Sequence, residues 1–204
     1  AQCNILNVFP NGKTRVQLFI KDETVTVADN GKYLDEYVFT VKHSYECCNK
    51  LIRKEFLITN QIAFGDNKEV YSEDLLFNIN LAKKLRKIVF INTPLYHYYQ
   101  YFDSHSKVNS LDKVKKLCRL FEMVYEEKYK FELSKLAVLI IMIHLSSLDK
   151  GYAEILSRQD IKKYLAYSLK SMKKLKQKIV MWSILYLPYF LKEQVIKLYY
   201  RNLR

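Results

Sequence analysis

Residues near the start of the chain alternate between apolar and polar positions, which is the period of β-strands. Three short strands are expected, over Cys3 to Phe9, Arg15 to Lys21 and Thr24 to Ala28. The dipeptide Asn11-Gly12 lies between the first two strands and is typical of a hairpin turn. The pattern therefore predicts a small sheet at this end of the chain.

Helical spacing then replaces the alternation and predicts a helix over Gly31 to Val41. Ser72 is expected to act as the N-cap of a further helix that ends near Arg86. Glu73 and Asp74 fall in its first turn, where the helix dipole favours negative charge.

A short apolar strand is expected over Ile88 to Asn92, closed by Thr93-Pro94 because proline cannot donate to a ladder of hydrogen bonds. Beyond Asp112 the spacing is helical throughout. The expected helices are Leu111 to Lys130, Phe131 to Leu148, Gln159 to Gln177 and Ile179 to Arg204. Leu136 to Leu145 is strongly apolar but shorter than the roughly 20 residues of a membrane span, so a buried core helix is expected there.

These elements predict an α/β fold that is mainly helical. Residues 1–110 are expected to hold a partial sheet edge with helices, and residues 111–204 a helical region. The chain has only four glycines and three prolines among 204 residues, which also favours helix over long turn-rich stretches.

The net charge of +13 indicates an anionic partner such as nucleic acid, a phospholipid surface or a phosphorylated glycan. Most of this charge is at one end, because residues 157–204 hold twelve Lys and Arg against two acids. The four cysteines, Cys3, Cys47, Cys48 and Cys118, have no C-x-x-C spacing and are interpreted as small hydrophobic residues in a reducing cytoplasm.

One run of motifs carries more information than a general pattern of helices and strands. It consists of Asn49 to Leu57, Asn60 to Phe64, Ser72 to Asn78, Ile88 to Asn92 and Pro94 to Tyr98, with Ala82-Lys83-Lys84 between. In order and spacing, the run resembles the acceptor-side, C-terminal part of the catalytic domain of bacterial family 2 glycosyltransferases. Those enzymes have a GT-A fold and build capsule, exopolysaccharide and lipopolysaccharide side chains.

The resemblance implies that Asp74 is the general base of an inverting sugar transfer, with Glu73 orienting the acceptor or the base. It also implies substrate contacts from Asn49, Lys50, Tyr96, His97 and Tyr98. The simpler alternative is that Ser72, Glu73 and Asp74 only cap a helix. Tyr96 and Tyr98 belong to an aromatic cluster that would either stack on sugar faces or pack in the core.

The family's nucleotide-binding elements, including a D-x-D motif that grips the metal-bound diphosphate, have no counterpart in these residues. The stretch Ala28 to Gly31 is more simply a turn. A divalent metal, Mn or Mg, is expected for a complete enzyme, with His97 as a candidate ligand and His43 and His105 as weaker ones. The nucleotide-sugar donor would bind through a missing N-terminal half, so this chain alone is expected to be inactive. Cys48 stands where relatives often have an aromatic residue.

Lysines from Lys170 to Lys178 lead into the apolar run Ile179 to Leu191, which holds Trp182 and Pro188. This pattern suits a helix that lies on an anionic membrane surface, near lipid-linked glycan acceptors at the inner face of the cytoplasmic membrane. A core helix with a solvated basic face is the alternative.

Two further function classes compete with the transferase. One is a noncatalytic membrane-surface or scaffold protein. The other, a nucleic-acid binder, is disfavoured because the basic residues flank an apolar run instead of interleaving with exposed aromatic residues.

Overall fold

The computed structural model describes residues 1–17, 20–38, 46–101, 110–148 and 150–200. The chain forms two compact units. The first comprises residues 1–66 and 72–107, and the second comprises residues 67–71 and 108–204. These ranges differ from the expected division at residue 110 chiefly because Asn67–Tyr71 belongs with the helical unit.

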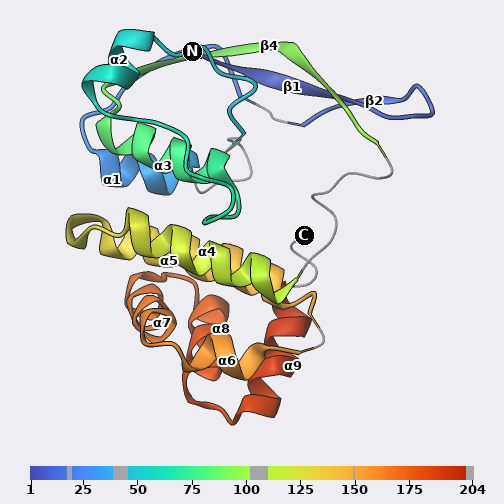
Figure 1. Ribbon diagram of the computed structural model, residues 1–204, viewed down its shortest axis with the longest axis vertical. Helices are drawn as coiled ribbons and strands as arrows, with labels where there is room; N and C mark the ends of the chain where they lie inside the picture. The colour runs from blue at the N-terminus through green and yellow to red at the C-terminus, as the bar shows by residue number, and fades with distance from the viewer. Residues whose placement is uncertain (18–19, 39–45, 102–109, 149, 201–204) are drawn as a thin grey trace. The chain divides into compact units, whose positions relative to one another are not determined.

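The first unit contains a four-stranded mixed sheet in the order β2-β1-β4-β3 (Figure 1). Its strands are β1 (Gln2–Val8), β2 (Thr14–Val16), β3 (Glu23–Thr26) and β4 (Lys87–Tyr99). β1 pairs antiparallel with β2 and parallel with β4, and β3 pairs antiparallel with β4. The expected N-terminal strands and the turn at Asn11-Gly12 are therefore confirmed, although β2 ends well before Lys21.

Strand β4 is much longer than the predicted strand, because it runs through Thr93 and Pro94 to Tyr99. The register between β1 and β4 shifts on both sides of Asn4, which lies opposite Pro94. The Asn4 side chain makes hydrogen bonds within this β-bulge. Its amide donates to the Asn92 side-chain oxygen at 3.1 Å, and Ile20 N donates to Asn4 Oδ1 at 3.2 Å. Pro94 does not end the strand, because the bulge removes the need for its missing N–H.

The helical elements of the first unit are short except for one. They are α1 (Asn30–Tyr33), the π-helical turn Leu34–Val38, α2 (Lys54–Thr59) and α3 (Glu73–Lys84). α1 and α3 lie on one face of the sheet (Figure 1). The predicted helix over Gly31 to Val41 is present as far as Val38, and its last residues lie outside the described ranges.

Residues 28–31, expected to be a turn, instead lead from a bend at Ala28 into α1, which begins at Asn30. Asp29 Oδ1 accepts hydrogen bonds from the N–H groups of Gly31 and Lys32, at 2.8 and 3.2 Å, and so caps the helix. The Asn30 amide donates to the carbonyls of Ala82 and Leu85, both at 2.8 Å. One dipeptide therefore begins α1 and satisfies carbonyl groups at the end of α3.

Apolar residues of the sheet and α3 form the core of the first unit. Ile5 of β1 and Phe90 of β4 are buried, as are Leu75 and Ile79 on α3. A second cluster of Ile62, Phe77 and Leu81 receives the side chains of the loop before α2, including Cys47. α3 is thus fixed on two sides, which holds its N-terminal turn in place.

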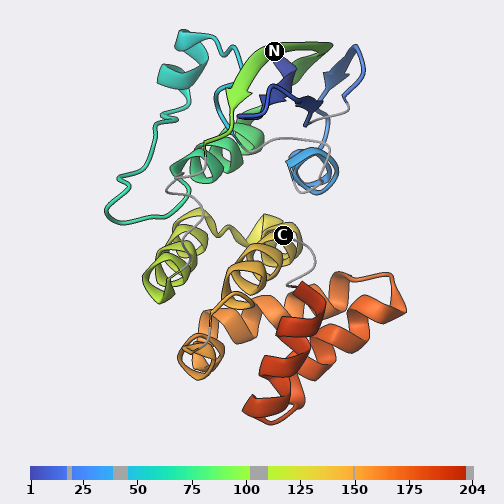
Figure 2. The same cartoon turned by 90° about the vertical axis from the view of Figure 1, so that its right-hand side faces the viewer.

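The second unit is helical (Figure 2). Its elements are α4 (Leu111–Val124), the 3-10 turn Glu127–Tyr129, α5 (Lys130–Leu145), α6 (Tyr152–Ser157), α7 (Gln159–Ser171), α8 (Leu175–Tyr186) and α9 (Tyr189–Tyr200). The sequence did not indicate α6. The single helix predicted over Ile179 to Arg204 is wrong, because Pro188 separates α8 from α9.

Helix α5 lies at the centre of this unit. Leu133, Ile141, Met142 and Leu145 are fully buried, which confirms the prediction of an apolar core helix over Leu136 to Leu145. Within the described ranges, no helix combines the length and apolar character needed to cross a bilayer.

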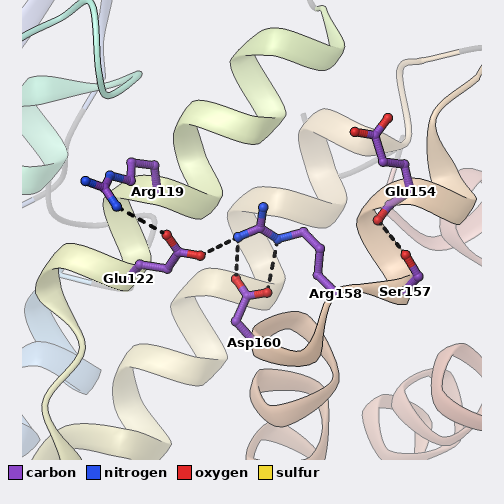
Figure 3. Close-up of polar contacts among 6 residues, drawn as sticks. All are labelled: Arg119, Glu122, Glu154, Ser157, Arg158 and Asp160. Atoms are coloured by element: carbon purple, nitrogen blue, oxygen red, sulfur yellow. Dashed lines mark hydrogen bonds and ion pairs between the residues drawn. The ribbon is translucent and has the colours of Figure 1, made fainter.

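A cluster of charges connects α4 to the start of α7 (Figure 3). The Arg158 guanidinium donates to both carboxylate oxygens of Asp160, each at 3.0 Å, and also to Glu122 of α4. These hydrogen bonds raise the pKa of Arg158 above its usual value, with Asp160 as the largest cause. Arg119 adds a longer contact to Glu122, at 3.8 Å. The paired hydrogen bonds to Asp160 fix the guanidinium at the start of α7, and its contact with Glu122 joins α7 to α4.

Candidate functional site

Asp74, the predicted base, is in the first turn of α3. Ser72 occupies the N-cap position, but its backbone is left-handed with φ of 72° and its side chain makes no capping hydrogen bond. The prediction that Ser72 caps the helix through its side chain is therefore wrong. Positive φ is uncommon outside glycine, and such backbone strain tends to occur where a site requires it.

The Asp74 carboxylate is directed toward the loop before α2. Its Oδ2 accepts a hydrogen bond from the backbone N–H of Cys47 at 3.3 Å. The Asn78 amide, one turn further along α3, donates to the Asp74 carbonyl at 2.8 Å and to the Cys47 sulfur at 3.2 Å. The loop and the helix are thereby fixed to each other at the position of the carboxylate.

Lys50 brings a partly buried amine close to the Asp74 carboxylate. Its Nζ donates to the Glu46 carbonyl at 2.6 Å and to Asn49 Oδ1 at 3.3 Å. Burial lowers the pKa of Lys50 to about 8, although Cys47, Glu46, Cys48 and Asp74 counteract part of the shift. Lys50 therefore loses its proton more readily than an ordinary lysine.

Cys47 and Cys48 differ in their surroundings. Burial raises the pKa of the half-buried Cys47 thiol to about 12, and the Asp74 charge adds to the shift. Cys48 is exposed, whereas Cys3 and Cys118 are buried; all are free thiols. The Cys48 side chain lies close to that of Tyr96 and raises the pKa of the tyrosine.

Asn49 connects the loop that carries Lys50 to strand β1. Its side chain is buried, and its amide donates to the Cys3 carbonyl at 2.8 Å, while Cys3 N donates to the Asn49 carbonyl at 3.0 Å. These bonds hold the loop against β1. Asn49 therefore acts on the site through the position of Lys50 and the loop.

Tyr96 and Tyr98 project from the same face of β4, since successive side chains of a strand alternate. Both rings are partly exposed. His97 is also exposed but lies on the opposite face of the strand. The structure thus brings Tyr96 beside Cys48, and the alternation separates His97 from it.

Glu73 precedes Asp74 at the first position of α3. Consecutive helical residues point about 100° apart, so the two carboxylates are directed differently. The geometry assigns the contact with the Cys47 loop to Asp74 alone of this pair.

No group of three or more His, Cys, Asp or Glu side chains that would hold a metal ion is found among the described residues. His97, the predicted ligand, has no such group around it. His43 and His105 lie outside the described residues. The residues that the structure describes therefore offer no ready-made ligand set for a divalent metal.

Two residues of this cluster were not predicted as site residues: Cys47 and Asn78. Asn78 lies four positions after Asp74 on a helix, and that spacing places both on one face. The contact between Cys47 and Asp74 joins residues that are 27 positions apart, which local spacing does not predict.

Models of protein families, curated proteins and solved structures were each compared with the chain, and none matches it. Functional inference therefore rests on the residues themselves. They provide an oriented carboxylate, a partly buried amine and partly exposed tyrosine rings within one unit.

Proposed function

We propose that the first unit is the acceptor side of an inverting glycosyltransferase of the family 2, GT-A type. Asp74 is its general base. The observation that carries this proposal is the Asp74 carboxylate, which bonds to the Cys47 loop instead of to the N–H groups of its own helix.

In the proposed reaction, Asp74 takes the proton of an acceptor hydroxyl as its oxygen attacks the anomeric carbon. A bond forms between that oxygen and the carbon, and the bond from the carbon to the nucleoside diphosphate breaks. The backbone N–H of Cys47 holds the carboxylate in one orientation, which fixes where the hydroxyl must lie. The acceptor is a cell-surface polysaccharide or a lipid-linked glycan.

The remaining residues have separate parts in this proposal. Tyr96 and Tyr98 offer flat apolar faces, with hydroxyl groups, to sugar rings. Lys50 places positive charge beside the carboxylate when protonated. The nucleotide-sugar donor and any divalent metal would be held by elements outside this chain.

Acceptor binding tests this function on the chain itself. We expect acceptor oligosaccharides to perturb the backbone NMR signals of Cys47, Asp74 and Tyr96, and nucleotide sugars alone to leave them unchanged. A Tyr96→Ala variant should weaken the perturbation, and Leu51→Ala, at another exposed side chain of the same unit, should not. Acceptors that perturb neither Cys47 nor Asp74 would argue against the proposal.

A further inference from the structure

Helix α8 presents apolar side chains on two opposite faces. Val180, Met181 and Ile184 are buried in the second unit. By contrast, the side chains of Leu175, Ile179, Trp182 and Tyr186 are 73, 56, 52 and 66% exposed. An ordinary surface helix buries its apolar face and exposes polar residues, so the second apolar face requires an explanation.

The four exposed residues, hereafter the α8 stripe, follow helical geometry. Their spacings of four, three and four residues place them within an arc of about 60° at 100° per residue. By the same geometry the buried residues lie on the opposite side. The stripe is therefore a continuous surface, and the rings of Trp182 and Tyr186 lie 5.5 Å apart within it.

Lysines surround the stripe. Lys173 and Lys174 precede α8, and Lys176 and Lys178 lie on either side of the stripe, about 70 to 90° around the helix from its centre. All four are exposed. The two acids of residues 157–204, Asp160 and Glu193, pair with Arg158 and Lys197. These two acids are therefore paired with other basic residues and do not neutralise the four lysines.

We propose that the α8 stripe and its lysines dock the protein on a membrane surface rich in anionic lipid. Isoleucine and leucine side chains would enter the boundary between headgroups and acyl chains, while the lysine stems reach outward to phosphate. Tryptophan and tyrosine favour the headgroup level, and both lie in the stripe. This docking is independent of the sugar transfer proposed above.

The dimensions agree with a helix that lies on the surface. Twelve residues of α8 extend about 18 Å, well short of the roughly 30 Å of a hydrocarbon core. Pro188 ends the helix, and Phe190 follows it with its side chain 68% exposed. A second copy of the chain is a poorer occupant, because it would bring two strongly basic helices together.

Trp182 is the only tryptophan of the chain, so its fluorescence reports on the stripe without any substitution. We expect phosphatidylglycerol vesicles to shift its emission to the blue, and brominated lipid in those vesicles to quench it. Pure phosphatidylcholine vesicles should have little effect. Vesicle binding that leaves Trp182 emission unchanged would overturn the proposal.

Charge reversal tests the lysines. Lys173→Glu with Lys174→Glu should lower vesicle partitioning by about tenfold or more, since each basic residue contributes about fivefold. Acids are favourable at a helix N-terminus, so this variant should keep α8 folded, as circular dichroism would check. Lys13→Glu with Lys54→Glu makes the same change in net charge at exposed positions of the first unit and should bind normally.

Three outcomes contradict lipid docking: equal loss in both charge-reversed variants, DNA binding without vesicle binding, or a dimer in solution that Trp182→Glu disrupts while vesicles do not bind. The first would mean that only net charge matters. The others would assign the surface to nucleic acid or to a second copy of the chain.

Discussion

The Asp74 carboxylate accepts a hydrogen bond from the backbone N–H of Cys47, at 3.3 Å, across 27 residues of sequence. An aspartate in the first turn of a helix usually serves that helix, through its free N–H groups or its dipole. Here the side chain is directed to a different loop, which also carries the partly buried Lys50. The hydrogen bond of the Asp74 side chain is therefore made to this loop and not to the N-terminal turn of α3.

Asn4 should be essential to the sheet. Asn4→Ala removes the hydrogen bonds that fill the irregularity beside Pro94, leaving Ile20 N and the Asn92 carbonyl without this partner. We expect a loss of about 3 kcal/mol in the free energy of unfolding. Asn11→Ala, which removes an exposed turn contact to Lys13 N, should cost less than about 1 kcal/mol. Similar losses in chemical denaturation would contradict this assignment.

Arg158 should stabilise the second unit through its paired geometry as well as its charge. Arg158→Lys keeps the charge but loses the two parallel hydrogen bonds to Asp160, and we expect a cost of about 1 kcal/mol because the pair is partly exposed. Arg119→Lys alters only the 3.8 Å contact to Glu122 and should be nearly neutral. Urea unfolding of both variants measures the difference, and equal effects would mean that the pairing adds nothing.

Lys50 should titrate near pH 8, below its ordinary value of 10.5. The pKa is lowered on folding, so burying the charge costs stability in full below about pH 8, and that cost is relieved as the pH rises toward 10.5. Lys50→Met should consequently gain stability relative to the unsubstituted chain at pH 7, and the gain should shrink at higher pH.

Competitive acetylation followed by mass spectrometry measures the Lys50 amine directly. Its reactivity should be half-maximal near pH 8. A midpoint near 10.5 would mean that the amine is solvated, and that it cannot change charge beside Asp74 near neutral pH.

The sequence predicted the elements whose signals are local. The hairpin at Gly12, the core helix α5 and the start of α3 follow from turn chemistry and apolar spacing. The extent of β4 could not be predicted this way. Pro94 alone predicts the end of a strand. The strand continues through it because the register shift at Asn4 of the partner strand leaves no hydrogen bond for a residue 94 N–H to make.

The helix break at Pro188 and the cluster around Asp74 depart from expectation for different reasons, the first local and the second long-range. Apolar spacing predicts one helix that continues through Pro188, whereas the structure ends α8 just before this residue, because proline lacks the N–H that a helix interior needs. Asp74 was identified only through resemblance. Its contact with Cys47, like the packing of Asn67–Tyr71 with the helical unit, joins positions distant in sequence that spacing does not reveal.

Substitution of Asp74 tests the central claim most directly. With the donor-binding elements supplied, Asp74→Asn should reduce sugar transfer by about 10²- to 10⁴-fold, because the amide cannot accept the acceptor proton. Donor affinity should be unchanged, and Glu55→Gln, an exposed acid in α2, should keep full activity. Full transfer by Asp74→Asn, or a loss of donor binding instead, would contradict the assignment of Asp74 as the base.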